Sequence, residues 1–246
     1  LQTKVYEIPA GSRVSKGKVI QSFLEIPADE NVSAIITYAE VRSQFLVMAT
    51  KNGLIKKTSL TDFSSVRRSG ILAIKLQAND QLKWVKLSSG QDEIILTTAQ
   101  GQAIRFKESA LRPMGRPAAG VRAIRLKKDD FVAGLDIIKS SAKSQIPNSK
   151  LLIVTENGFA KQTPLKEYKV QGRGGGGIKT AKITPKTGKI IAAQIVTAEE
   201  ELLAISIRGQ IIKTKIASVR LTGRATSGVR IMKLKQGDKV AGIVAL

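Results

Sequence analysis

The chain has 246 residues, of which 42% are hydrophobic, and this is enough apolar material for a packed core. Lys and Arg number 41 against 19 Asp and Glu, which gives a net charge of +22. Such an imbalance predicts a polyanionic partner, of which nucleic acid is the commonest. His and Cys are both absent, and this excludes imidazole bases, thiolate nucleophiles and nearly every transition-metal site.

The start of the chain, LQTKVYEIP, contains no secretory apolar segment, and no apolar run approaches the roughly 20 residues needed to cross a bilayer. We therefore predict no membrane partner. The absence of Cys fits the cytoplasm. Because residue 1 is Leu, we expect the chain to be a fragment or a processed piece of a longer protein.

In chain order, four hairpins are predicted, each with two apolar strands around an X-Gly turn. They cover residues 45–60, 94–106, 151–165 and 202–216. The turn glycines, which suit the positive φ angles of two-residue turns, are Gly53, Gly101, Gly158 and Gly209. Two more apolar strands are predicted after each hairpin, for example at 71–76 and 82–87. No long stretch shows helical periodicity.

A glycine-ended window of seven residues recurs along the chain. The windows are GSRVSKG, SSVRRSG, MGRPAAG, QGRGGGG and TGRATSG, and they start at residues 11, 64, 114, 171 and 222, which are 50 to 57 residues apart. In four of them an arginine stands four residues before the last glycine, and the second window supplies Arg67 and Arg68 instead. We expect each final glycine to adopt a positive φ angle where the chain re-enters a strand.

This period predicts an all-β fold. Four-stranded units of about 40 to 50 residues are typical of propeller blades around an axis. We place five of them in one domain of residues 1–246 and call them units 1 to 5, at approximately 1–40, 41–90, 91–145, 146–198 and 199–246. Unit 1 lacks its opening strand, so either a terminal strand elsewhere completes it or the ring is broken there.

Basic residues recur beside the windows, and in a ring they would form a continuous belt. They occupy the window itself and the positions two and five residues after its last glycine, with Val19, Leu72 and Ser22 as exceptions. The candidate DNA-binding residues are Arg13, Lys16, Lys18, Arg67, Arg68, Lys75, Arg116, Arg122, Arg125, Arg173, Lys179, Lys182, Arg224, Arg230 and Lys233, with the Gly174 and Gly175 amides as phosphate donors. The alternative interpretation is an ordinary solvated sheet face.

The residues also indicate which nucleic acid would bind. Aromatic residues are only 4% of the chain, too few for the base-stacking platforms of single-strand binders, and no recognition helix is visible. The glycines of residues 171–180 approach a nucleotide-loop pattern, but a strand follows them where such a loop opens a helix. The pattern favours contact with the duplex backbone, independent of base sequence and spread along a curved rim that bends the DNA.

The repeated window resembles the gyrase-A box, Q-R-R-G-G-K-G. Residues 171–177 match it at Gln171, Arg173, Gly174, Gly175 and Gly177. The stretches YEIPAGSRVSKG, LRPMGRPAAGVRAIRL and LTGRATSGVRIMKL are similar to successive blades of the C-terminal domain of the bacterial DNA gyrase A protein, so the resemblance covers essentially the whole chain. Two departures are Gly172 and Gly176, which replace an arginine and a lysine of the box.

The resemblance implies a β-pinwheel, a propeller-like disc whose blades exchange strands, in which a six-bladed fold would be truncated at its N-terminus. It implies duplex DNA wrapped on the basic perimeter in support of negative supercoiling, and its implied protein partners are the remainder of gyrase A and the gyrase B subunit. A bacterial cytoplasmic, nucleoid-associated location follows from it, with an organellar homologue as an alternative, and the isolated domain is expected to be monomeric.

No catalytic role is expected, and no cofactor or metal. The three tyrosines, Tyr6, Tyr38 and Tyr168, have no neighbouring catalytic arginine motif or acidic metal cluster. Two other functions stay open. One is the role of the topoisomerase IV C-terminal domain, which selects DNA geometry with weaker wrapping, and the other is a propeller that binds acidic protein partners.

Overall fold

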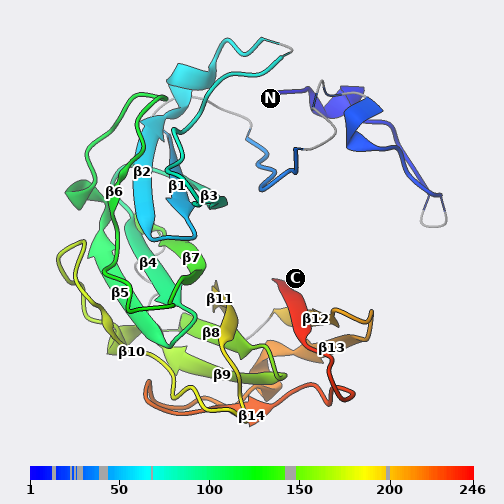
Figure 1. Ribbon diagram of the computed structural model, residues 1–246, viewed down its shortest axis with the longest axis vertical. Helices are drawn as coiled ribbons and strands as arrows, with labels where there is room; N and C mark the ends of the chain where they lie inside the picture. The colour runs from blue at the N-terminus through cyan, green and yellow to red at the C-terminus, as the bar shows by residue number, and fades with distance from the viewer. Residues whose placement is uncertain are drawn as a thin grey trace.

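The computed structural model describes residues 1–12, 15–22, 24, 26, 30–38, 44–67, 69–141, 148–197 and 200–246. The part of the chain within these ranges contains strands and short 3-10 helices and no α-helix. Its four sheets stand one after another around an open ring, with the N-terminal segment on one side of the opening and the C-terminal sheet on the other (Figure 1). The repeats predict an all-β fold of propeller-like blades, and the structure confirms it.

Each sheet is built from a hairpin, an inner strand and, in three cases, an outer strand. The order in sheet A is β3-β1-β2-β6, in sheet B β7-β4-β5-β10, in sheet C β11-β8-β9-β14 and in sheet D β15-β12-β13. The bounds of sheet A are β1 Phe45–Thr50, β2 Leu54–Ser59, β3 Leu82–Ser88 and β6 Val121–Arg122. Those of sheet B are β4 Glu93–Thr98, β5 Gln102–Lys107, β7 Val132–Ile138 and β10 Ile178–Lys179.

The remaining elements complete the later units. Sheet C comprises β8 Lys150–Thr155, β9 Phe159–Pro164, β11 Ile190–Val196 and β14 Val229–Arg230, and sheet D comprises β12 Glu201–Ser206, β13 Ile211–Lys215 and β15 Val240–Ala245. The 3-10 helices are η1 Val5–Glu7, η2 Ile20–Ser22, η3 Leu60–Phe63, η4 Glu108–Ala110, η6 Leu165–Glu167 and η7 Ile216–Ser218. Four of them, from η3 onward, begin directly after the second strand of a hairpin.

The outer strand of each four-stranded sheet belongs to the following unit. β6 lies in unit 3 but pairs with β2 of unit 2, and β10 and β14 pair in the same way with β5 and β9. The blades therefore exchange strands. The prediction of a full strand at 71–76 is wrong: these residues form no strand, because the part of unit 1 that the structure describes offers no second strand to pair with them.

Three of the apolar clusters join neighbouring units, and a smaller one around Met48, Phe63 and Ile74 lies within unit 2. One cluster joins Val47 and Ile55 of unit 2 with Ile94 and Phe106 of unit 3, and each of these side chains is fully buried. The inner strands β3, β7, β11 and β15 lie toward the centre of the ring (Figure 1). β7 and β11 approach so closely that a Cβ on Gly134 would lie 2.6 Å from the Ala193 carbonyl oxygen. Burial on folding thus depends on the next unit along the ring.

The turn glycines behave as the sequence predicts. All four hairpin glycines and all five window-ending glycines have positive φ angles, between 68° and 95°. Side chains fix the hairpin tips as well, since Asp80 and Asp238 each accept a hydrogen bond from a backbone amide of their own unit's hairpin turn. No helix within the described residues is long and apolar enough to cross a membrane.

Candidate nucleic-acid interface

The three outer strands carry the basic positions that stand two residues after each window. Val121 pairs with Ile55 and Arg122 with Leu54, and the equivalent residues of β10 and β14 repeat this antiparallel register. Because side chains alternate along a strand, the apolar member of each pair is half-buried and the basic member points to solvent. Arg122, Lys179 and Arg230 are thus exposed, and the strands that carry them, β6, β10 and β14, lie along the outer contour of the ring (Figure 1).

The basic residues five positions after each window continue this outer surface. Lys75, Arg125, Lys182 and Lys233 are all exposed. The first three also donate their backbone amides to the next window, to the carbonyl oxygens of Ala118, Gly175 and Thr226 at 3.4, 2.8 and 3.0 Å. The windows of units 3, 4 and 5 therefore each lie against the basic loop of the preceding unit. This continuity supports the belt predicted from the repeats for units 2 to 5.

The window arginines bridge consecutive units instead of standing free. Arg116 Nη1 donates to the Asp62 carbonyl oxygen at 3.2 Å, and Arg173 donates to the Ala110 and Arg122 carbonyl oxygens. Arg224 Nη1 donates to the Lys179 carbonyl oxygen at 3.3 Å. All three side chains are half-buried. They hold adjacent basic loops in place and keep only some of their donors for a ligand.

The window glycines serve this junction too. A Cβ on Gly177 would lie 2.5 Å from the Ala103 carbonyl oxygen, so the window passes directly over the second strand of the preceding unit. The Gly174 amide donates to the Ala123 carbonyl oxygen at 2.8 Å, and the Gly175 carbonyl accepts from Arg125. The Gly174 amide is thus occupied, and we correct its predicted role from phosphate donor to junction turn.

Two buried lysines donate hydrogen bonds to carbonyl oxygens of the windows, and the repeat period did not reveal them. Lys56 Nζ donates to the carbonyl oxygens of Gly115 and Arg116 at 2.8 and 2.7 Å, and Lys161 Nζ donates to Gly223 at 2.8 Å and to Arg224. Burial lowers the pKa of both amines, that of Lys161 to about 8. Their signal in the sequence is a lysine three residues after the hairpin glycine, but it occurs in only these two units.

The belt thins toward the N-terminus. Lys16, Lys18 and Arg67 are exposed, but unit 1 contributes no strand within its described residues, and Arg13 and Arg68 lie outside the described residues. At the outer-strand position, units 1 and 2 place Val19 and Leu72, with 69% and 59% of their surface exposed. The basic track is therefore strongest over units 3 to 5.

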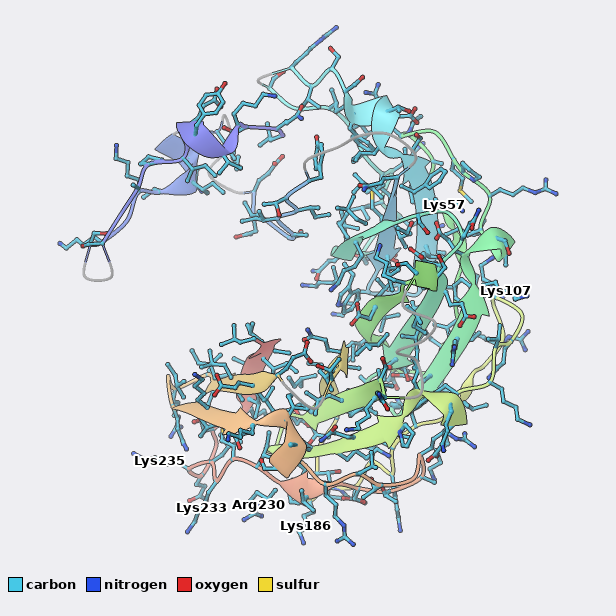
Figure 2. All side chains as sticks on the ribbon, turned by 180° about the vertical axis from the view of Figure 1, so that it is seen from behind. Lys57, Lys107, Lys186, Arg230, Lys233 and Lys235 are labelled. Carbon is cyan, nitrogen blue, oxygen red and sulfur yellow. The ribbon has the colours of Figure 1, made fainter. Side chains whose placement is uncertain are left out.

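Lys186, Lys235 and Arg208 add positive charge that the period did not reveal. All three are exposed and lie in turns of units 4 and 5. Figure 2 shows Lys186, Arg230, Lys233 and Lys235 projecting outward along the same stretch of rim. None of these four lysines and arginines forms an ion pair with an acidic residue among the described parts of the chain. Their charge is available to an external anion.

The described residues include no cluster of three or more His, Cys, Asp or Glu that could hold a metal ion. Of the tyrosines, Tyr168 is buried and its hydroxyl pairs with the hydroxyl of Thr180 at 2.5 Å, while Tyr6 is 84% exposed and so does not pack. Burial raises the pKa of Tyr168, which keeps its hydroxyl protonated.

The family is decided by comparison with known proteins. The model of the family described as the DNA gyrase C-terminal domain, beta-propeller, matches residues 1–38, 44–89, 92–139, 149–197 and 200–246. The chain belongs to this gyrase C-terminal-domain family. The DNA gyrase A protein of Staphylococcus epidermidis is 42% identical over 242 residues, and that of Staphylococcus aureus is 41% identical, with 98% of this chain covered in both cases.

Solved structures show the same gyrase C-terminal-domain fold. A DNA topoisomerase IV C-terminal domain superposes with a TM-score of 0.85 at 23% identity over 94% of this chain and 70% of that one. A DNA gyrase A C-terminal domain gives 0.82 at 24% identity over 94% and 76%. The chain spans about a quarter of the length of the staphylococcal gyrase A proteins, of which it covers 26% and 27%.

Proposed function

We propose that the chain is a non-catalytic module that binds duplex DNA without sequence preference and bends it along the outer strands, as part of a bacterial, cytoplasmic gyrase A protein. One observation carries this proposal. Arg122, Lys179 and Arg230 are exposed and recur at one register on β6, β10 and β14, and these strands lie on the outer contour of a curved ring (Figure 1). The duplex would follow this contour toward the rest of gyrase A and the gyrase B subunit.

The physical demand on the surface is considerable. Smoothly bending a site of 20 to 30 base pairs by 40 to 90° costs of order 1 to 6 kcal/mol, and this cost must be offset by phosphate contacts. Each neutralised phosphate releases counterions, so the logarithm of the binding constant falls with the logarithm of salt concentration at a slope of about −0.9 per contact. Units 3 to 5 each supply at least two exposed cations at the repeated positions, which makes a track of contacts that can support a bend.

A second candidate is the topoisomerase IV role, in which the domain bends DNA and selects its geometry with weaker wrapping. The apolar Val19 and Leu72 favour it, because they interrupt the basic track over units 1 and 2. Acidic protein partners are the third hypothesis, and they require no affinity for DNA beyond that of any equally basic protein.

Binding to linear duplexes of increasing length tests the proposal. Between about 20 and about 150 base pairs, the last being one persistence length, affinity should climb and then reach a plateau. A closed circle relaxed in the presence of the protein should retain a changed linking number, of positive sign if the wrap supports negative supercoiling. Affinity independent of length, together with an unchanged linking number, would contradict DNA bending.

A matched pair of triple variants tests whether the duplex follows the outer strands. Neutralising the outer strands by the triple change Arg122→Gln, Lys179→Gln and Arg230→Gln should flatten the salt slope by about 2.7, at about 0.9 per contact. The control removes the same charge at the ends of the hairpin strands remote from their turns, by Lys107→Gln, Lys166→Gln and Lys215→Gln, which are all exposed. Equal losses from both triples would show that total charge, and not the outer track, holds the DNA.

A further inference from the structure

A hollow of about 260 Å³ opens on the rim at the junction of units 4 and 5. Asn157 at the β8-β9 hairpin tip and Lys186 in the following turn form one side. The other side comes from unit 5, and its lining residues are Arg230, Leu234, Lys235, Gly237 and Asp238. In Figure 2 the labelled Lys186, Arg230, Lys233 and Lys235 follow one another along this part of the rim.

An aromatic ring organises two of these cations before any ligand arrives. The Lys186 ammonium nitrogen lies 5.8 Å from the centre of the Phe159 ring, and the Arg230 guanidinium carbon lies 5.2 Å from the same centre. Contact with the ring face restricts both side chains. Because less rotamer freedom is lost on binding, a pre-ordered pair of this kind binds an anion more tightly than free surface lysines do.

The acidic groups nearby are already occupied. Asp238 lines the hollow, but its carboxylate accepts from Ser206 Oγ at 2.7 Å and from the backbone amides of Arg208 and Lys239 at 3.2 and 2.9 Å. Hydrogen bonding, first of all from Ser206, lowers the pKa of Asp238, so it remains ionised and turned toward the hairpin. Glu156 pairs with Lys239 at 2.7 Å.

A fourth cation stands at the edge of the hollow. A Cβ built on Gly237 would lie 3.4 Å from an Nη atom of Arg208, so this guanidinium lies beside the lining. The junction of units 3 and 4 is poorer in charge, because Thr184 stands where unit 5 has Lys235 and the turn of unit 3 contains Asp129. At these two positions the junction of units 4 and 5 thus carries more positive charge than the junction of units 3 and 4.

We propose that this hollow binds one backbone phosphate of the duplex and holds the DNA more tightly than the rest of the rim does, so that the bound path is anchored between units 4 and 5. The inference rests on the proposed function. A guanidinium can donate to both non-bridging oxygens of a backbone phosphate at once, and the two ammonium groups attract the single negative charge that these oxygens share. Mutual repulsion among the uncompensated cations is relieved when the anion arrives.

Two double variants of equal charge test the anchor. The first is Lys186→Gln with Lys235→Gln, and the second, in the turn of unit 3, is Lys127→Gln with Lys128→Gln, where both lysines are exposed. The probe is a duplex of about 15 base pairs, roughly 50 Å at about 3.4 Å per base pair, which is too short to follow the whole rim. The first variant should lose at least tenfold in affinity, and its salt slope should flatten by about 0.9. The second variant should lose less than threefold in affinity.

A chain without cysteine offers a second, independent measurement. Lys235→Cys and Lys127→Cys, each labelled with a photocrosslinker, should react with the same short duplex very unequally, with Lys235→Cys far ahead at limiting DNA. Equal affinity losses and equal crosslinking would overturn the anchor while leaving the proposed function intact. Wild-type protein that binds duplex no better than another protein of the same charge would instead remove the proposed function. Loss of binding to a polyglutamate peptide but not to DNA would assign the hollow to acidic proteins.

Discussion

β9 of unit 4 and β13 of unit 5 occupy the same place in their units and differ sharply in burial. Every residue of β9 except Pro164 is buried, whereas β13 alternates between exposed and half-buried residues. Their sequences, FAKQTP and IIKTK, follow the same hairpin turn. The difference is that β14 covers the outer edge of β9, and sheet D has no fourth strand. A strand in this fold is buried by what the next unit brings to it and not by its own composition.

The largest expected effect uses two isoleucines at equivalent positions, two residues after the hairpin glycine. Ile55 is fully buried, whereas 57% of the surface of Ile211 is exposed. Ile55→Ala should lower the free energy of unfolding by about 2 to 5 kcal/mol, and Ile211→Ala should change it by less than about 0.5 kcal/mol. Urea unfolding measures both. A cost above about 1.5 kcal/mol for Ile211→Ala would mean that something covers β13 in solution.

Two hairpin glycines extend the comparison between hairpins that a following unit covers and the hairpin of unit 5. Gly101 and Gly209 have φ angles of 86° and 81°, but a Cβ on Gly101 would lie 2.6 Å from the Ala181 carbonyl oxygen, and one on Gly209 would meet nothing within 4 Å. Gly209→Ala should cost about 1 kcal/mol for the left-handed backbone alone. Gly101→Ala should cost about 3 kcal/mol, because the steric clash is added. Equal costs would show that the neighbouring unit does not press on this turn.

The pH dependence of stability isolates the contribution of the buried Lys161 amine. Burial lowers the pKa of Lys161 to about 8, while that of an unfolded lysine is about 10.4. Between these values the unfolded chain binds more protons than the folded one, so this group makes stability rise with pH. Lys161→Met should remove that increment between about pH 8 and about pH 10. The exposed control Lys166→Met should retain the rise of stability with pH. An unchanged slope in Lys161→Met would contradict the burial of the Lys161 amine against the window.

A smaller effect on stability than that of Ile55→Ala or Gly101→Ala is expected from Arg173→Lys, which keeps the charge but cannot reach both the Ala110 and Arg122 carbonyl oxygens. Loss of one such bond costs about 0.5 to 1.5 kcal/mol. The salt slope of DNA binding should stay unchanged, and the rise of affinity with duplex length should weaken, because the curvature of the rim is less firmly set. Arg112→Lys, an exposed arginine beside η4, is the control. A flattened salt slope in Arg173→Lys would assign this arginine to phosphate contact instead.

The hairpins and the period could be predicted from the sequence because their signals are local: an X-Gly turn between apolar strands and a glycine-ended window. The pairing of β6 with β2 was not predictable from the residues, since a two-residue strand finds its partners 66 and 68 residues earlier in the chain. The same distance hides Lys56, whose partners Gly115 and Arg116 lie 59 and 60 residues away. Lys186 and Lys235 were not predicted as part of the belt, because turn residues do not keep the fixed register that strand residues have.

Strand exchange determines how mechanical load spreads through this molecule. β6 is covalently continuous with unit 3 and hydrogen-bonded to unit 2, so an outward pull on Arg122 strains both at once. The two-residue ladder shares this strain with the Lys56 contacts, which also join units 2 and 3. Tension along the outer edge of the ring is thereby shared between neighbouring units. Within the described residues, no strand of another unit pairs with the outer edge of β13 to share load in this way.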